Sequence, residues 1–125
     1  ETFAFTLTAW DINHDGTLLN RRPFANLAAP TDGISLDAEG CVWVACPYFS
    51  YGDSGGWVRV ADGGEIKQVI PLSDPDKSAY ACMLGGIDGR DLYLCESTLL
   101  GRERFQGDGR VRKVRVEIPR AENQF

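Results

Sequence analysis

The stretch Thr31–Ala45, TDGISLDAEGCVWVA, decides the fold. It opens with one acidic residue, Asp32, at the start of a short strand, passes through a Gly-containing turn and ends in a strongly apolar strand. The chain repeats this plan about fifty residues later as YACMLGGIDGRDLYLC, residues 80–95. A turn-punctuated β unit that recurs at this period is typical of a β-propeller blade. The first copy carries a carboxylate where the second carries none, and this departure from the repeat marks the first candidate for function.

Strand signals dominate the rest of the chain, and no stretch shows a convincing helical period. The predicted strands are residues 3–12, 17–24, 33–36, 41–46, 57–61, 65–72, 81–84, 91–95 and 110–118. Residues 1–28 then supply the outer strands of one blade, residues 32–72 a complete blade and residues 79–118 three strands of a last blade. Residues 119–125 are expected to form a frayed tail. The predicted fold class is therefore all-β, a partial propeller of about three blades.

Three partial blades leave sheet edges bare, which complete propellers avoid by closing their ring. We therefore expect the chain to need covalent continuation into the remaining propeller, a second copy of the chain or a repaired edge. The sequence begins at Glu1 rather than Met and shows no signal peptide. Either a segment has been removed or the chain is a piece of something longer.

Composition excludes several classes of protein. The chain has 125 residues, of which 43% are hydrophobic, so it can build a core and is not a disordered segment. Its net charge of −5 argues against a nucleic-acid partner or an anionic membrane. No apolar run approaches the roughly 20 residues that a membrane helix needs. A local basic run alternates with valines and is interpreted as solvated strand and loop faces; it comprises Arg102, Arg104, Arg110, Arg112, Lys113 and Arg115.

The four cysteines, Cys41, Cys46, Cys82 and Cys95, form no C-x-x-C pair, so zinc-binding spacing is absent. Cys41 and Cys46 flank one predicted strand, which places them roughly 16 Å apart and too far for a disulfide. We interpret all four as free thiols in a reducing compartment, which predicts a cytoplasmic protein. A disulfide between adjacent blades remains the alternative.

Four segments together carry a family resemblance. They are TDGISLDAEGCVWVA, WDINHDGTLLNRRPFA at residues 10–25, ACMLGGIDGRDLYLC at residues 81–95 and GRVRKVRVEIP at residues 109–119. In this order they resemble the gluconolactonase, regucalcin and luciferin-regenerating-enzyme family over nearly the whole chain. The resemblance implies a six-bladed propeller with one divalent metal ion in its central channel. Six blades need roughly 300 residues, so this chain would be the C-terminal portion, and the missing outer strand of the last blade would come from the N-terminal end.

The resemblance also assigns Asp32, which matches the family's metal ligand and proposed general base. The family's other ligands, a Glu and an Asn, lie in upstream segments, and no residue here matches them; Thr31 stands where the family often has Pro. A single Asp suits calcium, magnesium or manganese, and zinc is tolerable. The alternatives are that Asp32 caps a turn ahead of Gly33, and that the isolated chain binds no metal.

Other candidate residues have simpler explanations. Asp37 and Glu39 are interpreted as hairpin-turn acids on the solvent side, and Trp43 and Tyr93, at equivalent repeat positions, as packing residues. Cys82 lies near the repeat equivalent of Asp32 and could face the channel, but no base partner is evident. Three aromatic residues either line a channel rim or pack in a loop; they are Tyr48, Phe49 and Tyr51.

One segment imitates a calcium-binding loop. The spacing Asp11-x-Asn13-x-Asp15-Gly16 matches the start of an EF-hand, but position twelve is Arg22 instead of the required Glu. We interpret the segment as a hairpin turn and His14 within it as a surface residue.

Two functional hypotheses follow. In the first, the chain is the C-terminal part of a metal-dependent hydrolase of a sugar or small aliphatic lactone, in which the metal polarises the ring carbonyl and Asp32 accepts a proton from water. On this hypothesis the isolated chain is inactive. In the second, the chain is a non-catalytic half-propeller that oligomerises and binds a small molecule or a protein.

Overall fold

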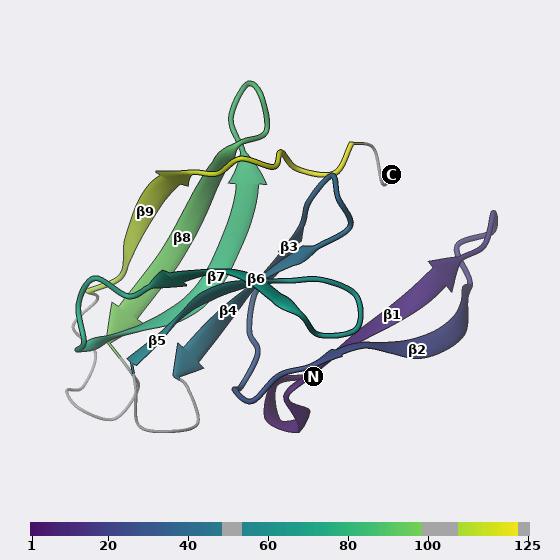
Figure 1. The fold of residues 1–125 in the computed structure, drawn as a ribbon, viewed down its shortest axis with the longest axis horizontal. Coiled ribbons are helices and arrows are strands. Elements are labelled where there is room, and N and C mark those ends of the chain that lie inside the picture. Colours follow the sequence, from purple (N-terminus) through teal and green to yellow (C-terminus); the bar gives the residue numbers. More distant parts are fainter. Residues whose placement is uncertain (49–53, 99–107, 123–125) are drawn as a thin grey trace.

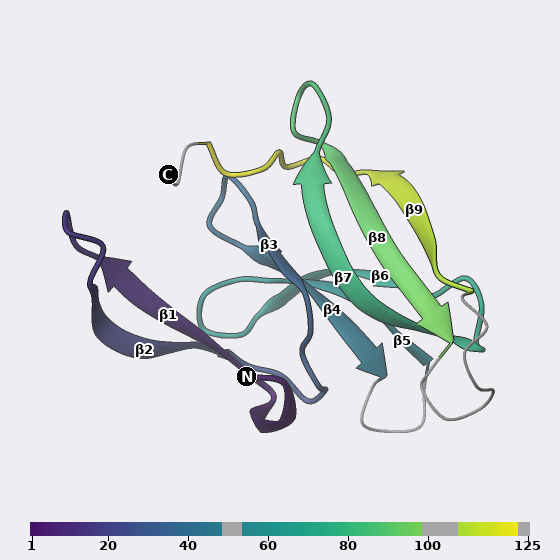
Figure 2. The same cartoon turned by 180° about the vertical axis from the view of Figure 1, so that it is seen from behind.

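The computed structural model describes residues 1–48, 54–98 and 108–122. Within these ranges a 3₁₀ turn, η1 (Thr2–Ala4), precedes nine strands in three antiparallel sheets. The sheets are β1 (Thr6–Ile12) with β2 (Leu18–Asn26); β3 (Ile34–Leu36), β4 (Val42–Tyr48), β5 (Ser54–Val60) and β6 (Ile66–Pro71); and β7 (Lys77–Gly85), β8 (Asp91–Thr98) and β9 (Arg110–Arg115). Figures 1 and 2 show the four-stranded sheet between the other two. The expected all-β fold with a complete middle sheet is confirmed.

Strand β4 is the centre of the core because both of its faces are buried. Trp43 and Ala45 pack with residues of β7 and β8, whereas Val42 and Val44 pack with residues of β1 and β2. The period-2 geometry of a strand sends alternate side chains to opposite faces, which explains why this segment is apolar at almost every position. Each fully buried large aliphatic side chain contributes roughly 1.5–3 kcal/mol to stability. The apolar run VWVA thus joins three sheets into one body.

Strand β7 attaches the last sheet to the middle one, packing against β3, β4 and β5. The indole Nε1 of Trp57 donates a hydrogen bond of 3.0 Å to the carbonyl of Ala81, and the amide of Leu84 donates one of 3.0 Å to Ser35 Oγ. The Ala81 carbonyl and the Leu84 amide of β7 are therefore satisfied by the neighbouring sheet. These contacts fix β7 beside β3, where Asp32 lies.

The C-terminal segment corrects one expectation. Residues 119–121 are hydrogen-bonded instead of frayed: the carbonyl of Pro119 accepts from Ala38, and the amides of Arg120 and Ala121 donate to Gly89 and Leu36. Figure 1 shows this segment crossing from β9 past the β7–β8 hairpin to the β3–β4 hairpin. Side-chain patterning could not indicate this because the contacts are made by backbone groups.

Several boundaries also differ from the expected strands. Phe5 has a left-handed backbone with φ of 58°, so the first strand begins at Thr6 instead of residue 3. Strand β7 begins at Lys77, four positions before the expected start at residue 81, and β5 begins at Ser54, three positions before the expected start at residue 57. Polar and small residues thus continue these ladders beyond their apolar centres.

One face of the β7–β9 sheet has no described sheet packed over Met83, Tyr93 and Val111, which are exposed. Ser35 pairs with Trp43, and Met83 pairs with Tyr93, so the two aromatic residues occupy equivalent positions. Trp43 is fully buried against the next sheet, whereas Tyr93 is 36% exposed, and Met83 and Val111 are exposed to a greater extent. The packing interpretation is confirmed for Trp43, whereas for Tyr93 it stays a prediction: its ring lies beside Gly85, and no described sheet packs against it.

Candidate functional site

Asp32 precedes the short strand β3, and its peptide is held from two sides. Its amide donates to the carbonyl of Ala45 in β4 at 2.9 Å, and the following amide, that of Gly33, donates to the carbonyl of Tyr80 in β7 at 2.9 Å. Thr31, before it, is buried. The side chain of Asp32 is nevertheless exposed. The structure thus fixes the backbone of Asp32 while leaving its carboxylate accessible.

Asp32 is one of the residues that line a cavity of about 890 Å³. The cavity lies between β1 and β2 on one side and β3 with the start of β4 on the other; its lining includes Leu7, Trp10, Phe24, Ile34 and Val42. Strand β1 pairs with β2 alone among the described strands, so its second edge is unpaired beside this space. The cavity therefore lies where the sequence predicts the missing inner strands of the first blade.

Asp32 and Glu1 are the two acidic residues in the cavity lining. Hydrogen bonds from Arg21 and Thr8 lower the pKa of Glu1 and occupy its carboxylate. No hydrogen bond or ion pair from a described residue reaches the carboxylate of Asp32. The alternative that Asp32 caps the turn before Gly33 therefore has no support in the described geometry, and its carboxylate is available for a ligand or a proton.

The donor set around Asp32 tests whether this chain fits a metal. Within residues 1–48, 54–98 and 108–122, no three His, Cys, Asp or Glu side chains gather closely enough to hold a metal ion. An exposed carboxylate suits an oxygen-preferring divalent cation as one ligand of several. Asp32 therefore fits such an ion, but the remaining donors would have to come from outside the described residues.

Asp37 corrects a further expectation, because it is buried instead of lying on the solvent side. It is 1% exposed, and its Oδ1 accepts from the amides of Glu39 at 2.9 Å and Cys41 at 3.0 Å. Its Oδ2 accepts from Arg59 Nε at 2.6 Å. Burial alone would lower the pKa of Arg59, but hydrogen bonds to Asp37 and to the exposed Glu39 raise that pKa overall. Asp37 is thus part of a structural ion pair and not of the cavity.

Cys82 is likewise buried between sheets instead of facing a channel. Its thiol lies 3.5 Å from the carbonyl of Trp43 and 3.6 Å from that of Gly33. Burial raises the pKa of Cys82 to about 12 and that of Cys46 to about 11, so neither thiol ionises readily. All four cysteines are free, and Cys95 is the one that is partly exposed. The strand register places Tyr80, and not Cys82, at the repeat equivalent of Asp32.

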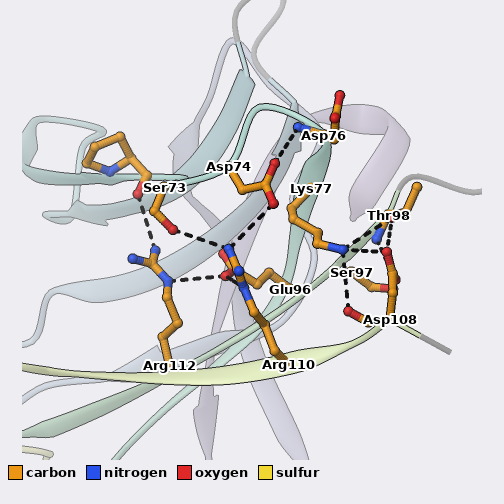
Figure 3. Close-up of polar contacts among 11 residues, drawn as sticks. Ser73, Asp74, Asp76, Lys77, Glu96, Ser97, Thr98, Asp108, Arg110 and Arg112 are labelled. Carbon is orange, nitrogen blue, oxygen red and sulfur yellow. Dashed lines mark hydrogen bonds and ion pairs between the residues drawn. The ribbon is translucent and has the colours of Figure 1, made fainter.

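A polar network at the ends of β7, β8 and β9 was not predicted from the sequence (Figure 3). Glu96 is 2% exposed and pairs with Arg110 and, at 3.3 Å, with Arg112. Arg112 also lies over the Trp57 ring, 5.4 Å from its centroid. The interpretation of the basic run as solvated faces therefore fails for Arg112, which is half-buried, whereas Arg110 pairs with Glu96 but remains exposed. The available signal was that Glu96 continues the buried alternation of Leu92 and Leu94, which requires a cationic partner.

Asp108 closes the second half of this network. Its carboxylate accepts from Lys77, from the hydroxyl and amide of Thr98 and from Ser97 (Figure 3). These hydrogen bonds, from Lys77 first, hold the pKa of Asp108 well below its usual range. The donors around Asp108 are described residues of this chain, so this half of the network explains local stability.

The remaining candidates are peripheral. His14 is exposed in the turn between β1 and β2, where the amide of Gly16 donates to the carbonyl of Asn13 at 2.9 Å, as in a hairpin turn. Tyr48 is exposed at the end of β4, and Phe49 and Tyr51 lie outside the described residues. No helix among the described residues is long and apolar enough to cross a membrane.

Comparison with known proteins identifies similar sequences and a similar fold. A family model described as "SMP-30/Gluconolactonase/LRE-like region" matches residues 1–98. The chain is 32% identical over 98 residues to regucalcin from Danio rerio, covering 75% of this chain and 31% of that protein. It also superimposes on a solved structure of a luciferin-regenerating enzyme with a TM-score of 0.72 and 18% identity, over 94% of this chain and 40% of that one. The chain thus spans less than half the length of these relatives, and its three sheets form part of a propeller.

Proposed function

We propose that this chain, which belongs to the SMP-30/gluconolactonase/LRE-like family, is the C-terminal part of a metal-dependent lactone hydrolase. Its substrate class would be sugar or small aliphatic lactones. The observation that carries the proposal is the free carboxylate of Asp32, exposed at the cavity on a peptide that two sheets hold. The family match supports the reaction class, since gluconolactonase is among the activities that the family's name contains.

The chemistry assigned to this chain is a proton transfer at Asp32. Its carboxylate accepts a proton from the attacking water, whose oxygen bonds to the lactone carbonyl carbon. The ring C–O bond then breaks, and the ring oxygen takes the proton back from Asp32 and leaves as the hydroxyl of a hydroxy acid. A divalent cation, when bound, would polarise the carbonyl. Asp32 would be one of its oxygen ligands, with calcium, magnesium, manganese or zinc as candidates.

The partners in this proposal are the lactone and the remaining propeller. Asp32 is one ligand, so the residues of this chain are not expected to hydrolyse a lactone by themselves. The four free cysteines support a reducing compartment, and on that ground we propose a cytoplasmic location.

A second candidate function rests on the uncovered face of the β7–β9 sheet. Met83, Tyr93 and Val111 expose apolar surface there, and β9 pairs with β8 alone among the described strands. Such a face and edge suit a second copy of the chain. On this alternative the chain is a non-catalytic half-propeller that binds a small molecule or a protein partner.

A lactone-hydrolysis assay on the chain expressed with its upstream segment tests the first proposal. We expect divalent-metal-dependent activity, and a loss of about 10²- to 10⁴-fold in Asp32→Asn, because the substitution removes the base and a charged ligand. Thermal melting of Asp32→Asn should match the wild type because the side chain is exposed.

The matched control is Glu39→Gln, which changes an exposed acid at the other end of β3 and should leave activity unchanged. An Asp32→Asn protein with full metal-dependent activity would refute the mechanism. A variant that unfolds would instead make Asp32 a structural residue. The second candidate function would be favoured if neither the wild type nor Asp32→Asn hydrolysed a lactone and the 125-residue chain formed a stable dimer in light scattering.

A further inference from the structure

The backbone of Asp32 and Gly33 touches two different sheets. On one side the amide of Asp32 donates to Ala45, and the carbonyl of Gly33 accepts from the Ala45 amide, both at 2.9 Å. On the other side the amide of Gly33 donates to the carbonyl of Tyr80 at 2.9 Å. The first pair belongs to the same sheet as Asp32, whereas the last bond crosses to β7. The neighbouring sheet therefore contributes directly to where Asp32 lies.

A β-bulge explains why the Tyr80 carbonyl is available. In the β7–β8 ladder Ala79 pairs with Glu96 and Ala81 with Cys95, so the register shifts at Tyr80, which has no partner in that ladder. A bulged residue is left unpaired, which frees its backbone groups for other contacts. Beside the bulge, the Trp57 indole donates to the carbonyl of Ala81 at 3.0 Å, and this bond holds the bulge against the middle sheet.

Gly33 fits this contact because it has no side chain. A Cβ atom at this position would lie 2.7 Å from Ala81 Cα, 2.9 Å from Ala81 Cβ and 3.1 Å from the Tyr80 carbonyl oxygen. The backbone of Gly33 is not in the left-handed region, so glycine is required here for close approach and not for conformation. Two of these neighbours are backbone atoms, which can move only if β7 moves. Any larger residue must therefore displace either β7 or the Asp32 peptide.

We propose that Gly33 is a positioning residue which, with the bulge at Tyr80, sets the place of the Asp32 carboxylate from the neighbouring sheet. The effect on ligand binding rests on the proposed function of Asp32, whereas the contact itself does not. Functional groups need to be held within about 0.5 Å of their working position. A Cβ 2.7 Å from the Ala81 Cα lies well inside the ordinary contact distance of 3.4–4 Å. Relieving this clash requires a backbone shift larger than that tolerance. Substitution at Gly33 should therefore act through Asp32.

The experiment compares three variants of the chain expressed with its upstream segment. Gly33→Ala introduces the clash, and Gly33→Ala with Ala81→Gly removes one of the atoms that cause it. Gly56→Ala is the matched control: its Cβ would lie 2.6 Å from the Ile70 carbonyl oxygen, a comparable crowding, but between β5 and β6, with β4 between it and β3. Calcium titration calorimetry measures the site, and urea unfolding measures stability.

We expect both single glycine variants to lose stability and Gly33→Ala alone to lose calcium affinity, by about ten- to a hundred-fold, as for other residues that support metal ligands. The added Ala81→Gly should restore only part of that affinity, because the clash with the backbone of residue 81 remains. Calcium binding by Gly33→Ala equal to that of the wild type would overturn the proposal and make the contact one of packing alone.

A wild type that binds no calcium would refute the metal in the proposed function, and the positioning contact would then be decided by NMR. The readouts are the carboxyl carbon shift of Asp32 and the hydrogen-exchange protection of the amide at position 33. A changed shift and lost protection in Gly33→Ala, with both unchanged in Gly56→Ala, would support the contact. An unchanged Asp32 shift in Gly33→Ala would refute it.

Discussion

Replacing Asp37 by Asn should destabilise the chain strongly, although the change is confined to one end of a short side chain. Both carboxylate oxygens of Asp37 are acceptors: Oδ1 takes the amides of Glu39 and Cys41, and Oδ2 takes Arg59 Nε. An amide offers one oxygen and one NH₂ group, so either orientation of the new side chain points a donor at a donor. The substitution also leaves the Arg59 guanidinium, whose side chain is 10% exposed, without its buried counter-charge.

The expected loss is about 3 kcal/mol. Removing one partner of a buried ion pair costs about 3–5 kcal/mol. The lower end applies here because Glu39, whose side chain is 57% exposed, still pairs with Arg59 at 2.8 Å. With a urea m value of about 1.5 kcal/mol/M, a 3 kcal/mol loss lowers the unfolding midpoint by about 2 M. Urea unfolding followed by tryptophan fluorescence is a suitable assay because Trp43 and Trp57 are buried in the core.

Two further variants separate this effect from a general loss of charge. Glu39→Gln removes the exposed partner of the same guanidinium and should cost at most about 1 kcal/mol. Asp37→Asn combined with Arg59→Met should lose less than the two single variants added together, because no unpaired buried charge remains. A loss below about 1 kcal/mol in Asp37→Asn, or a loss in Glu39→Gln of equal size, would refute the reasoning.

Two other predictions concern stability and thiol chemistry. Ending the chain after Ile118 removes the backbone hydrogen bonds of Pro119, Arg120 and Ala121. Calorimetry should therefore show a loss of about 1–3 kcal/mol in the free energy of unfolding. An unchanged melting temperature would mean that these contacts are not formed in solution. A thiol reagent at a mildly alkaline pH should modify Cys95 first, because burial raises the pKa of Cys46 and Cys82. In denaturant without reductant, the same reagent should count all four thiols. A lower count would reveal disulfides.

The fold was predictable because its main signals are local. The apolar run at β4 and its repeat at β8 were visible as alternation bounded by turns, and the predicted strands correspond to those observed with shifts at their ends. Burial of Trp43 was also predictable, because an aromatic residue in such a run packs inward. The exposure of Tyr93 was not predictable, because the repeat predicts a neighbouring sheet that the described residues do not contain.

The environment of the acidic residues was only partly predictable. The sequence placed Asp32 at the opening of a strand, and the structure leaves its carboxylate exposed there. For Asp37 the sequence predicted a solvent-facing side chain, because an acidic residue in a turn usually faces solvent. The buried partner of Asp37, Arg59, lies on a strand 22 positions away in the sequence. The Tyr80 bulge has no sequence signature, since neither glycine nor proline marks it. Contacts that depend on long-range register or on backbone groups therefore required the structure.

The accuracy with which Asp32 is held cannot come from its own strand. Strand β3 has three residues, which is too short to fix a side chain by its own ladder. Its backbone is fixed by β4 through Ala45 and by β7 through Tyr80, and both strands are anchored in the core by buried aromatic and aliphatic residues. The groups that make the β3–β7 contact all belong to this chain, so the contact does not depend on which partner or segment covers the exposed faces. Loss of the inter-sheet contact, and not loss of β3 itself, is the change expected to release Asp32.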